Sequence, residues 1–138
     1  MDQPSAILLV DTIGELSAWW GVATIAFVGG SFGSRGGQNM IEPAAYGAAV
    51  CFGPKTRNFR DIVDSLVAAE AAVVVADAEA LEAFVRRCLD DPAYAAALGS
   101  RARQMVQRQL GATERTVQRI DSLLHSGRNR QAIPREAA

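Results

Sequence analysis

Residues 27–43 read Phe27-Val28-Gly29-Gly30-Ser31-Phe32-Gly33-Ser34-Arg35-Gly36-Gly37-Gln38-Asn39-Met40-Ile41-Glu42-Pro43. The apolar start is typical of a buried strand, which ends in two glycines and opens into a glycine-rich loop. Pro43 does not fit deep inside a helix and disfavours helical geometry at Glu42, so we expect a helix to begin between Asn39 and Pro43. The loop then lies at the carboxyl end of a strand, where open α/β sheets place their ligands.

This glycine-rich loop has two interpretations. Glycines let backbone N–H groups approach an anion closely, and the following helix start adds unpaired donors and the positive end of its dipole. Tight turns also require glycine, so a structural turn is the alternative to a phosphate or nucleotide site. In a ligand site, Arg35 would pair with a phosphate or carboxylate, and Glu42 with the two hydroxyls of a ribose. In a structural turn, Arg35 would be a solvated charge, while Asn39 and Glu42 would cap the helix.

The rest of the sequence predicts an α/β fold. Short apolar runs without strict alternation suit strands that are buried on both faces of a parallel sheet. Helical signals separate them, including a capping box at Thr12–Glu15 and helix starts at Asn58, at Asp91 with Pro92, and at Thr113. Beyond Asp77 we expect only helices. The predicted strands are Ile7–Val10, Ile25–Val28, Ala49–Phe52 and Val73–Ala76.

Composition narrows the possible classes of protein. A chain of 138 residues with 49% hydrophobic composition suits one domain, which we place at residues 1–126, followed by a flexible tail at 127–138. The net charge of −1 gives no reason to expect nucleic acid as a partner. The two cysteines lack the spacing of a metal site or a disulfide framework, and we expect no metal and no cofactor. Without a membrane-spanning run or a signal peptide, the prediction is a soluble, cytoplasmic protein.

The sequence contains the motifs Asp11-Thr-Ile-Gly-Glu-Leu16, Ala26-Phe-Val-Gly-Gly-Ser31, Arg35-Gly-Gly-Gln-Asn39, Glu42-Pro43, Phe52-Gly-Pro54 and Asn58-Phe59. In their order and spacing they resemble the motifs of the 3-deoxy-D-manno-octulosonic acid (Kdo) transferases. The likeness runs from about Ile7 to about Leu124. It implies an incomplete Rossmann-like domain of about four parallel strands with C-terminal helices, as in the C-terminal half of a two-domain GT-B glycosyltransferase.

The resemblance also implies where a substrate binds. The family binds CMP-Kdo mainly in its C-terminal domain, through segments that match Ile13–Glu15 and Asn39–Glu42. It places its catalytic base, a glutamate, on an N-terminal acceptor domain, which we expect to be missing here, so we expect no catalytic residue in this chain. The expected substrate-binding residues are Ile13, Gly14, Glu15, Gly30, Ser31, Arg35, Gly36, Gly37, Gln38, Asn39, Met40, Ile41 and Glu42.

Two positions depart from the family pattern. The family commonly has histidine where this chain has Gln38, and again where it has Lys55. Neither residue titrates near neutral pH as histidine does, so we expect donor choice or affinity to differ. The family also has a Pro-Arg motif that contacts CMP at the start of its C-terminal domain, and we expect that motif to be missing here.

The leading hypothesis is the donor-binding part of a glycosyltransferase, with CMP-Kdo as the donor. The resemblance implies transfer of Kdo to a lipid A precursor in lipopolysaccharide synthesis, and contact with that precursor only through the N-terminal domain. It also implies that full-length members lie at the cytoplasmic face of the inner membrane, and that this chain alone is inactive. The alternatives are a stand-alone nucleotide-binding module, or a fragment of a related UDP-sugar transferase or epimerase.

Overall fold

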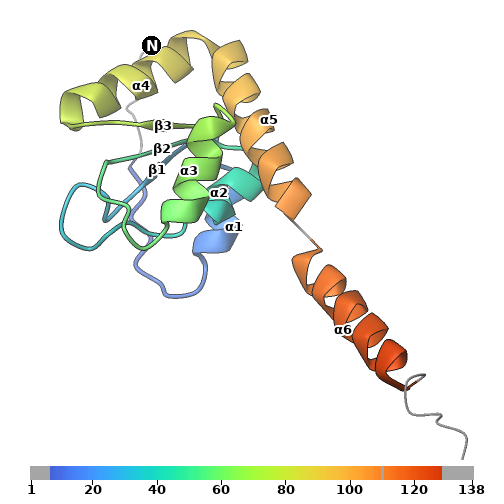
Figure 1. The fold of residues 1–138 in the computed structure, drawn as a ribbon. Coiled ribbons are helices and arrows are strands. Elements are labelled where there is room, and N and C mark those ends of the chain that lie inside the picture. The colour runs from blue at the N-terminus through green and yellow to red at the C-terminus, as the bar shows by residue number, and fades with distance from the viewer. Residues whose placement is uncertain (1–6, 110, 129–138) are drawn as a thin grey trace, which may run out of the picture. The chain divides into compact units, whose positions relative to one another are not determined.

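The computed structural model describes residues 7–109 and 111–128. The chain consists of two units, and the boundary between them in the sequence lies between Val106 and Gln107. Helices and strands alternate along the first unit until β3 ends, and only helices follow, as the sequence predicts (Figure 1). The elements are α1 (Leu16–Trp20), β1 (Ile25–Val28), α2 (Ile41–Tyr46), β2 (Ala49–Phe52), α3 (Arg60–Ala68), β3 (Ala72–Val74), α4 (Ala78–Asp90), α5 (Pro92–Gln109) and α6 (Ala112–Arg128).

The strands form a parallel sheet in the order β1-β2-β3, which confirms the predicted α/β class. Ile25 pairs with Ala49 across the first ladder, and Val50 pairs with Ala72 across the second. The central strand β2 is buried along its whole length, as expected for a parallel strand covered on both faces. Because all three strands point the same way, the loops that follow β1 and β2 leave the sheet at the same edge.

Side chains alternate between two hydrophobic cores, one on each face of the sheet. Val50 and Phe52 of β2 point into the first core, which α2, α3 and the later part of α5 complete. Ala49 and Cys51 point into the second core with residues of α4 and the earlier part of α5. The first unit therefore has helices on both faces of its sheet, and α5 contributes to both cores.

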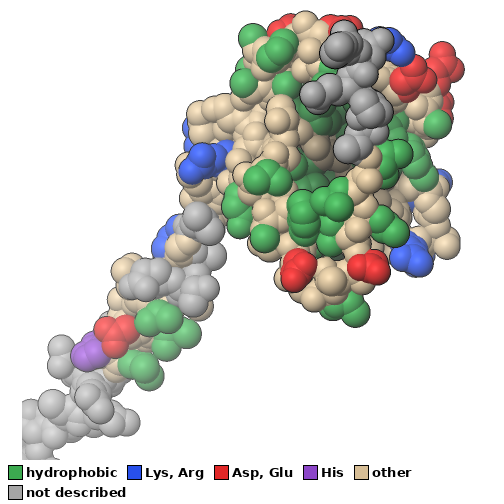
Figure 2. All heavy atoms as spheres, turned by 180° about the vertical axis from the view of Figure 1, so that it is seen from behind, with side chains coloured by type: hydrophobic (Ala, Val, Ile, Leu, Met, Phe, Trp, Pro, Cys, Tyr) green, Lys and Arg blue, Asp and Glu red, His purple; other side chains and the backbone are tan. Residues whose placement is uncertain are grey.

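The predicted first strand, Ile7–Val10, is wrong. These residues have no regular secondary structure, and their exposure ranges from 37% to 96%. A β-branched run becomes a strand only where a neighbouring strand accepts its backbone hydrogen bonds, and no described residue pairs with the edge of β1 that faces away from β2. The described sheet accordingly has three strands instead of about four. Figure 2 shows exposed hydrophobic side chains on the first unit.

The predicted helix start at Asp91 and Pro92 is confirmed, and the structure adds a cap at Asp77 that we did not predict. Asp77 accepts a hydrogen bond from the N–H of Ala80 at 2.9 Å and caps α4, and Asp91 accepts one from Tyr94 at 2.9 Å, one turn into α5. Pro92 is the first residue of α5, where its missing N–H costs nothing. The signals at Asp91 and Pro92 are local in the sequence, which is why they could be predicted from it.

Three other predicted caps differ from the structure. The Thr12 hydroxyl donates to the Glu15 carboxylate at 2.7 Å, and α1 begins only after Glu15, so no capping box forms. The Asn58 amide donates to the carbonyl of Arg35 instead of capping α3. Helix α6 begins at Ala112, so Thr113 lies inside the helix. In the first two cases a competing hydrogen-bond partner takes the polar side chain that would have capped the helix.

The second unit contains α6, whose residues Val117, Ile120, Leu123 and Leu124 are 52–69% exposed instead of buried as their spacing predicts. A helix buries an apolar stripe only by packing it against another element, and a single helix has none within its own unit. The predicted tail begins within α6, and residues 129–138 of it lie outside the described residues. The domain boundary at 126 stays a prediction.

Both cysteines are buried free thiols, as expected. Burial raises the pKa of the Cys51 thiol to about 12, and it also raises the pKa of Cys88. Both thiols therefore stay protonated at neutral pH and are poor nucleophiles. Within residues 7–109 and 111–128, no cluster of acidic, histidine and cysteine side chains has the arrangement of a metal site, and none of the helices is long and apolar enough to cross a membrane.

Gly99 lies in the middle of α5, where glycine normally weakens a helix. A Cβ atom at this position would collide with the carbonyl oxygen of Gly47, in the turn between α2 and β2. The absence of a side chain lets α5 pack directly against this turn. The close approach fixes the C-terminal end of α2, and thereby the position of the helix that follows the glycine-rich loop.

We expect Gly99→Ala to destabilise the protein by about 1–3 kcal/mol, because the new methyl group forces α5 away from Gly47. The same substitution at an exposed helix position would stabilise the protein by about 1 kcal/mol. Urea denaturation measures the free energy of unfolding. Gly29→Ala is the control, because a Cβ there meets nothing within 4 Å. Unchanged or increased stability of Gly99→Ala would contradict this packing.

Candidate functional site

Two loops meet at the carboxyl ends of β1 and β2. We call residues 29–40, between β1 and α2, the glycine loop, and residues 53–59, between β2 and α3, the second loop. Ser31 joins them: its fully buried hydroxyl donates to the carbonyl of Val28 at 2.6 Å and accepts from the N–H of Gly53 at 2.8 Å. One hydroxyl therefore ties the end of β1 to the residue that follows β2.

Backbone hydrogen bonds extend this connection along both loops. The N–H of Lys55 donates to the carbonyl of Ser31 at 2.8 Å, and that of Asn58 donates to Gly36 at 3.1 Å. The side-chain amide of Asn58 donates to the carbonyl of Arg35 at 2.8 Å. The second loop is thus bonded to the glycine loop at three separate residues and holds it in one conformation.

Gly36 and Gly37 are required by the backbone itself. Both have positive φ, at 84° and 86°, a region that other residues rarely adopt. A Cβ on Gly36 would lie 2.6 Å from Cγ of Arg57, and one on Gly37 would lie 3.0 Å from the methyl group of Met40. Glycine at these positions lets the two loops pack directly on each other.

The glycine loop also presents a run of free donors. Among the described residues, no hydrogen bond uses the backbone N–H groups of residues 32–36. Glycine-rich loops with such donors at the carboxyl end of a parallel strand are suited to hold a phosphate or another anion. This arrangement favours the ligand-site interpretation of the loop.

The start of α2 is organised by Asn39 and Glu42. The N–H of Ile41 donates to Oδ1 of Asn39 at 3.0 Å, and the amide of Asn39 donates to Oε1 of Glu42 at 2.9 Å. Helix α2 begins at Ile41, inside the predicted interval. The Asn39 amide holds one oxygen of the half-buried Glu42 carboxylate, and the other oxygen keeps its capacity to accept hydrogen bonds.

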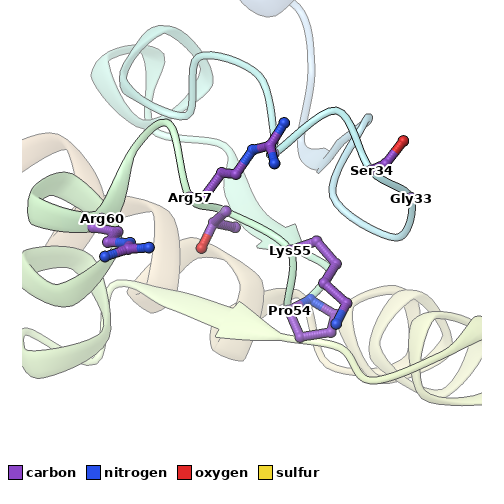
Figure 3. A pocket seen from close by; sticks show the side chains of 8 residues that line it. Gly33, Ser34, Pro54, Lys55, Arg57 and Arg60 are labelled. Carbon is purple, nitrogen blue, oxygen red and sulfur yellow. The ribbon is translucent and has the colours of Figure 1, made fainter.

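A cavity of about 280 Å³ opens between the two loops. Figure 3 shows Gly33 and Ser34 on the glycine loop, and Lys55 and Arg57 on the second loop. We did not predict the second loop as part of the site, although two of the motifs quoted above, Phe52-Gly-Pro54 and Asn58-Phe59, frame it. The cavity is lined by Gly33, Ser34, Gly36, Pro54, Lys55, Thr56, Arg57 and Arg60.

The predicted site residues do not all lie together. Gly30, Ser31 and residues 35–42 belong to the glycine loop and the start of α2, where Ser31, Gly36, Gly37 and Met40 are buried. Residues Ile13, Gly14 and Glu15 precede α1. Ser17 of α1 lies near Tyr46, the last residue of α2, with 3.5 Å between the two hydroxyl oxygens. No hydrogen bond within the described part of the chain joins residues 13–15 to the glycine loop. Their role stays a prediction.

Ser31→Ala tests whether this hydroxyl holds the two loops together. We expect the free energy of unfolding to fall by about 1–3 kcal/mol, because the buried N–H of Gly53 and the carbonyl of Val28 each lose a partner. Ser34→Ala is the matched control: Ser34 lies on the same loop but is exposed, so the change should stay within about 0.5 kcal/mol. Equal effects of the two substitutions in urea denaturation would contradict the role of Ser31.

Comparison with known proteins relates this chain to one group of enzymes. It is 39% identical over 118 residues to a 3-deoxy-D-manno-octulosonic acid transferase from Bordetella pertussis, covering 86% of this chain and 28% of the relative. A protein of the same name from Haemophilus influenzae is 34% identical, covering 83% of this chain and 27% of the relative. The chain therefore spans little more than a quarter of these relatives. No protein-family model matches the sequence.

A solved structure supports the same relationship. The C-terminal CMP-Kdo binding domain of WaaA from Acinetobacter baumannii superposes with a TM-score of 0.67 and 31% identity, covering 71% of this chain and 51% of that domain's chain. The parallel sheet and flanking helices agree with one half of a GT-B glycosyltransferase. In sequence and in fold, the chain is homologous to the C-terminal region of the Kdo transferases.

Proposed function

We propose that this chain binds CMP-Kdo and is the donor-binding part of a Kdo transferase. The observation that carries the proposal is its similarity to a CMP-Kdo binding domain, combined with the free N–H groups of the glycine loop. In this proposal the phosphate of the donor lies against the N–H groups of residues 32–36. Those donors are fixed before the ligand arrives, because the second loop already holds the glycine loop, and binding then orders fewer groups.

The nucleoside is assigned to the start of α2. Glu42 is the acid in the predicted site that lies beside the glycine loop, and its carboxylate is oriented by Asn39 at 2.9 Å. A carboxylate with an open oxygen suits the two hydroxyls of a ribose, which donate hydrogen bonds side by side. The segment Ile13–Glu15, which the family resemblance adds to the site, would contact the nucleotide from the side of α1.

The acceptor and the catalytic base are assigned to sequence outside this chain. Transfer of a sugar requires a base that removes the proton of the acceptor hydroxyl while the donor is held in line. Glu42 already bonds to Asn39, and Glu15 already bonds to Thr12. We therefore propose that an N-terminal acceptor domain supplies the base and the contact with a lipid A precursor, at the cytoplasmic face of the inner membrane.

We expect CMP to bind weakly to the 138-residue chain, with UMP and AMP binding more weakly still. An NMR titration should shift the amide signals of residues 13–15 and 30–42, and added salt should reduce the affinity, because the contact with the phosphate is largely electrostatic. Shifts concentrated elsewhere, or none at millimolar CMP, would contradict the proposed site.

Glu42→Ala should weaken CMP binding about tenfold, which corresponds to about 1.4 kcal/mol. The reason is the loss of charged acceptors for the ribose hydroxyls. Glu79→Ala is the matched control, because Glu79 is an exposed acid in the first turn of α4, far along the chain from the glycine loop. Equal affinities of the two variants for CMP would remove Glu42 from the site.

We expect the chain alone to transfer no Kdo to a lipid A precursor, and activity to appear when an N-terminal acceptor domain is supplied. Positioning of donor, acceptor and base together is worth several kcal/mol of barrier, on the order of 7–11 kcal/mol in favourable cases. The transfer of radiolabelled Kdo to the lipid A precursor measures this activity. Transfer at an enzymatic rate by the 138-residue chain would mean that one of its own carboxylates is the base.

A further inference from the structure

The cavity between the two loops is surrounded by positive charge. Lys55, Arg57 and Arg60 line it, and Arg35 belongs to the glycine loop beside it. The glycine loop and the second loop contain Arg35, Lys55 and Arg57 and no acid, although the whole chain has a net charge of −1. Arg60 and Asp61 follow at the start of α3. Within the described residues, none of the four cations forms an ion pair. A concentration of unpaired cations around a cavity favours an anionic ligand.

Arg57 is the cation that the fold places against the glycine loop. Its Cγ and Nε atoms lie 2.6 Å and 3.0 Å from the position of a Cβ on Gly36, so its side chain packs directly on that backbone. The neighbouring Asn58 is fixed by two hydrogen bonds to the glycine loop, at Gly36 and Arg35. Figure 3 shows Arg57 directed toward the glycine loop, whereas the side chain of Lys55, on the same second loop, points the other way and ends beside Pro54. Arg60, by contrast, is carried by α3.

The proposed donor has two anionic groups. One is the phosphate of CMP, and the other is the carboxylate of the octulosonic acid. The N–H groups of residues 32–36 can satisfy one of them, but a second anion in the same complex requires separate donors. Arginine binds carboxylates through paired N–H groups, and lysine adds a compact charge.

We propose that the cavity is a subsite for the carboxylate of the donor sugar, with Arg57 as the residue that pairs with it and Lys55 as a second cation at the cavity that adds positive charge. The proposal rests on the proposed binding of CMP-Kdo and adds the residues that select an acidic sugar. It also assigns a role to Lys55, a position at which the resembled family commonly has histidine. A neutral sugar of the same size would leave both cations without a partner in the cavity and bind more weakly.

Arg57→Gln in the 138-residue chain tests the subsite. We expect the affinity for CMP-Kdo to fall about tenfold, and the affinity for CMP, which lacks the sugar carboxylate, to change less than about twofold. Lys55→Gln should act in the same direction. The matched control is Arg86→Gln, since Arg86 is an exposed arginine of α4 that pairs with Glu82 at 2.8 Å. Its affinities for both ligands should stay at the wild-type values.

Equal losses of CMP and CMP-Kdo affinity in Arg57→Gln would assign Arg57 to the phosphate and overturn the carboxylate subsite. No loss for either ligand would remove Arg57 from the site. If the wild-type chain binds no CMP, the proposed function fails, and titration with free Kdo then decides the subsite alone. Amide shifts at residues 33–36 and 54–57 with Kdo, absent with glucose and absent in Arg57→Gln, would support it. No such shifts would overturn it.

Discussion

The hydroxyl of Ser31 is the contact on which the arrangement of the site depends. It is completely buried and bonds at once to the end of β1, through Val28, and to the start of the second loop, through Gly53. Since β1 and β2 are adjacent and parallel, their carboxyl ends lie at the same edge of the sheet, and this hydroxyl fixes the distance between the loops that leave them. Phe32 stacks on Phe27 at a centroid distance of 5.3 Å and holds the next residue of the glycine loop.

The chemistry of the site follows from that constraint. A glycine loop that is bonded to a second loop keeps its free N–H groups in place without a ligand, and preorganised donors bind an anion at a lower entropic cost. The same contact brings Lys55 and Arg57 to a cavity lined by Gly33 and Ser34. Backbone donors and cationic side chains then lie at one edge of the sheet, although residues 41–52 separate the two loops in the sequence.

Signals that act within a few residues could be read from the sequence. β1, β2, the start of α2 and the Asp91 cap were predicted because each depends on neighbouring residues. Ile7–Val10 was wrongly predicted as a strand, because strand formation requires a partner that the described residues do not provide. Asn58 resembles a cap in the sequence, but its amide bonds to Arg35, 23 residues earlier. The second loop was missed because its place in the site depends on which strands are neighbours in the sheet. If β1 and β2 had been assumed to be adjacent and parallel, the sequence would have placed this loop beside the glycine loop.

The most direct measurement is a crystal structure of the chain with CMP-Kdo. The account predicts the phosphate within hydrogen-bond distance of the N–H groups of residues 32–36, with the two loops still joined through Ser31. It also predicts the sugar carboxylate beside Arg57 and Lys55. A nucleotide bound away from the glycine loop, or loops that separate and break the bond between Ser31 and Gly53 on binding, would contradict it.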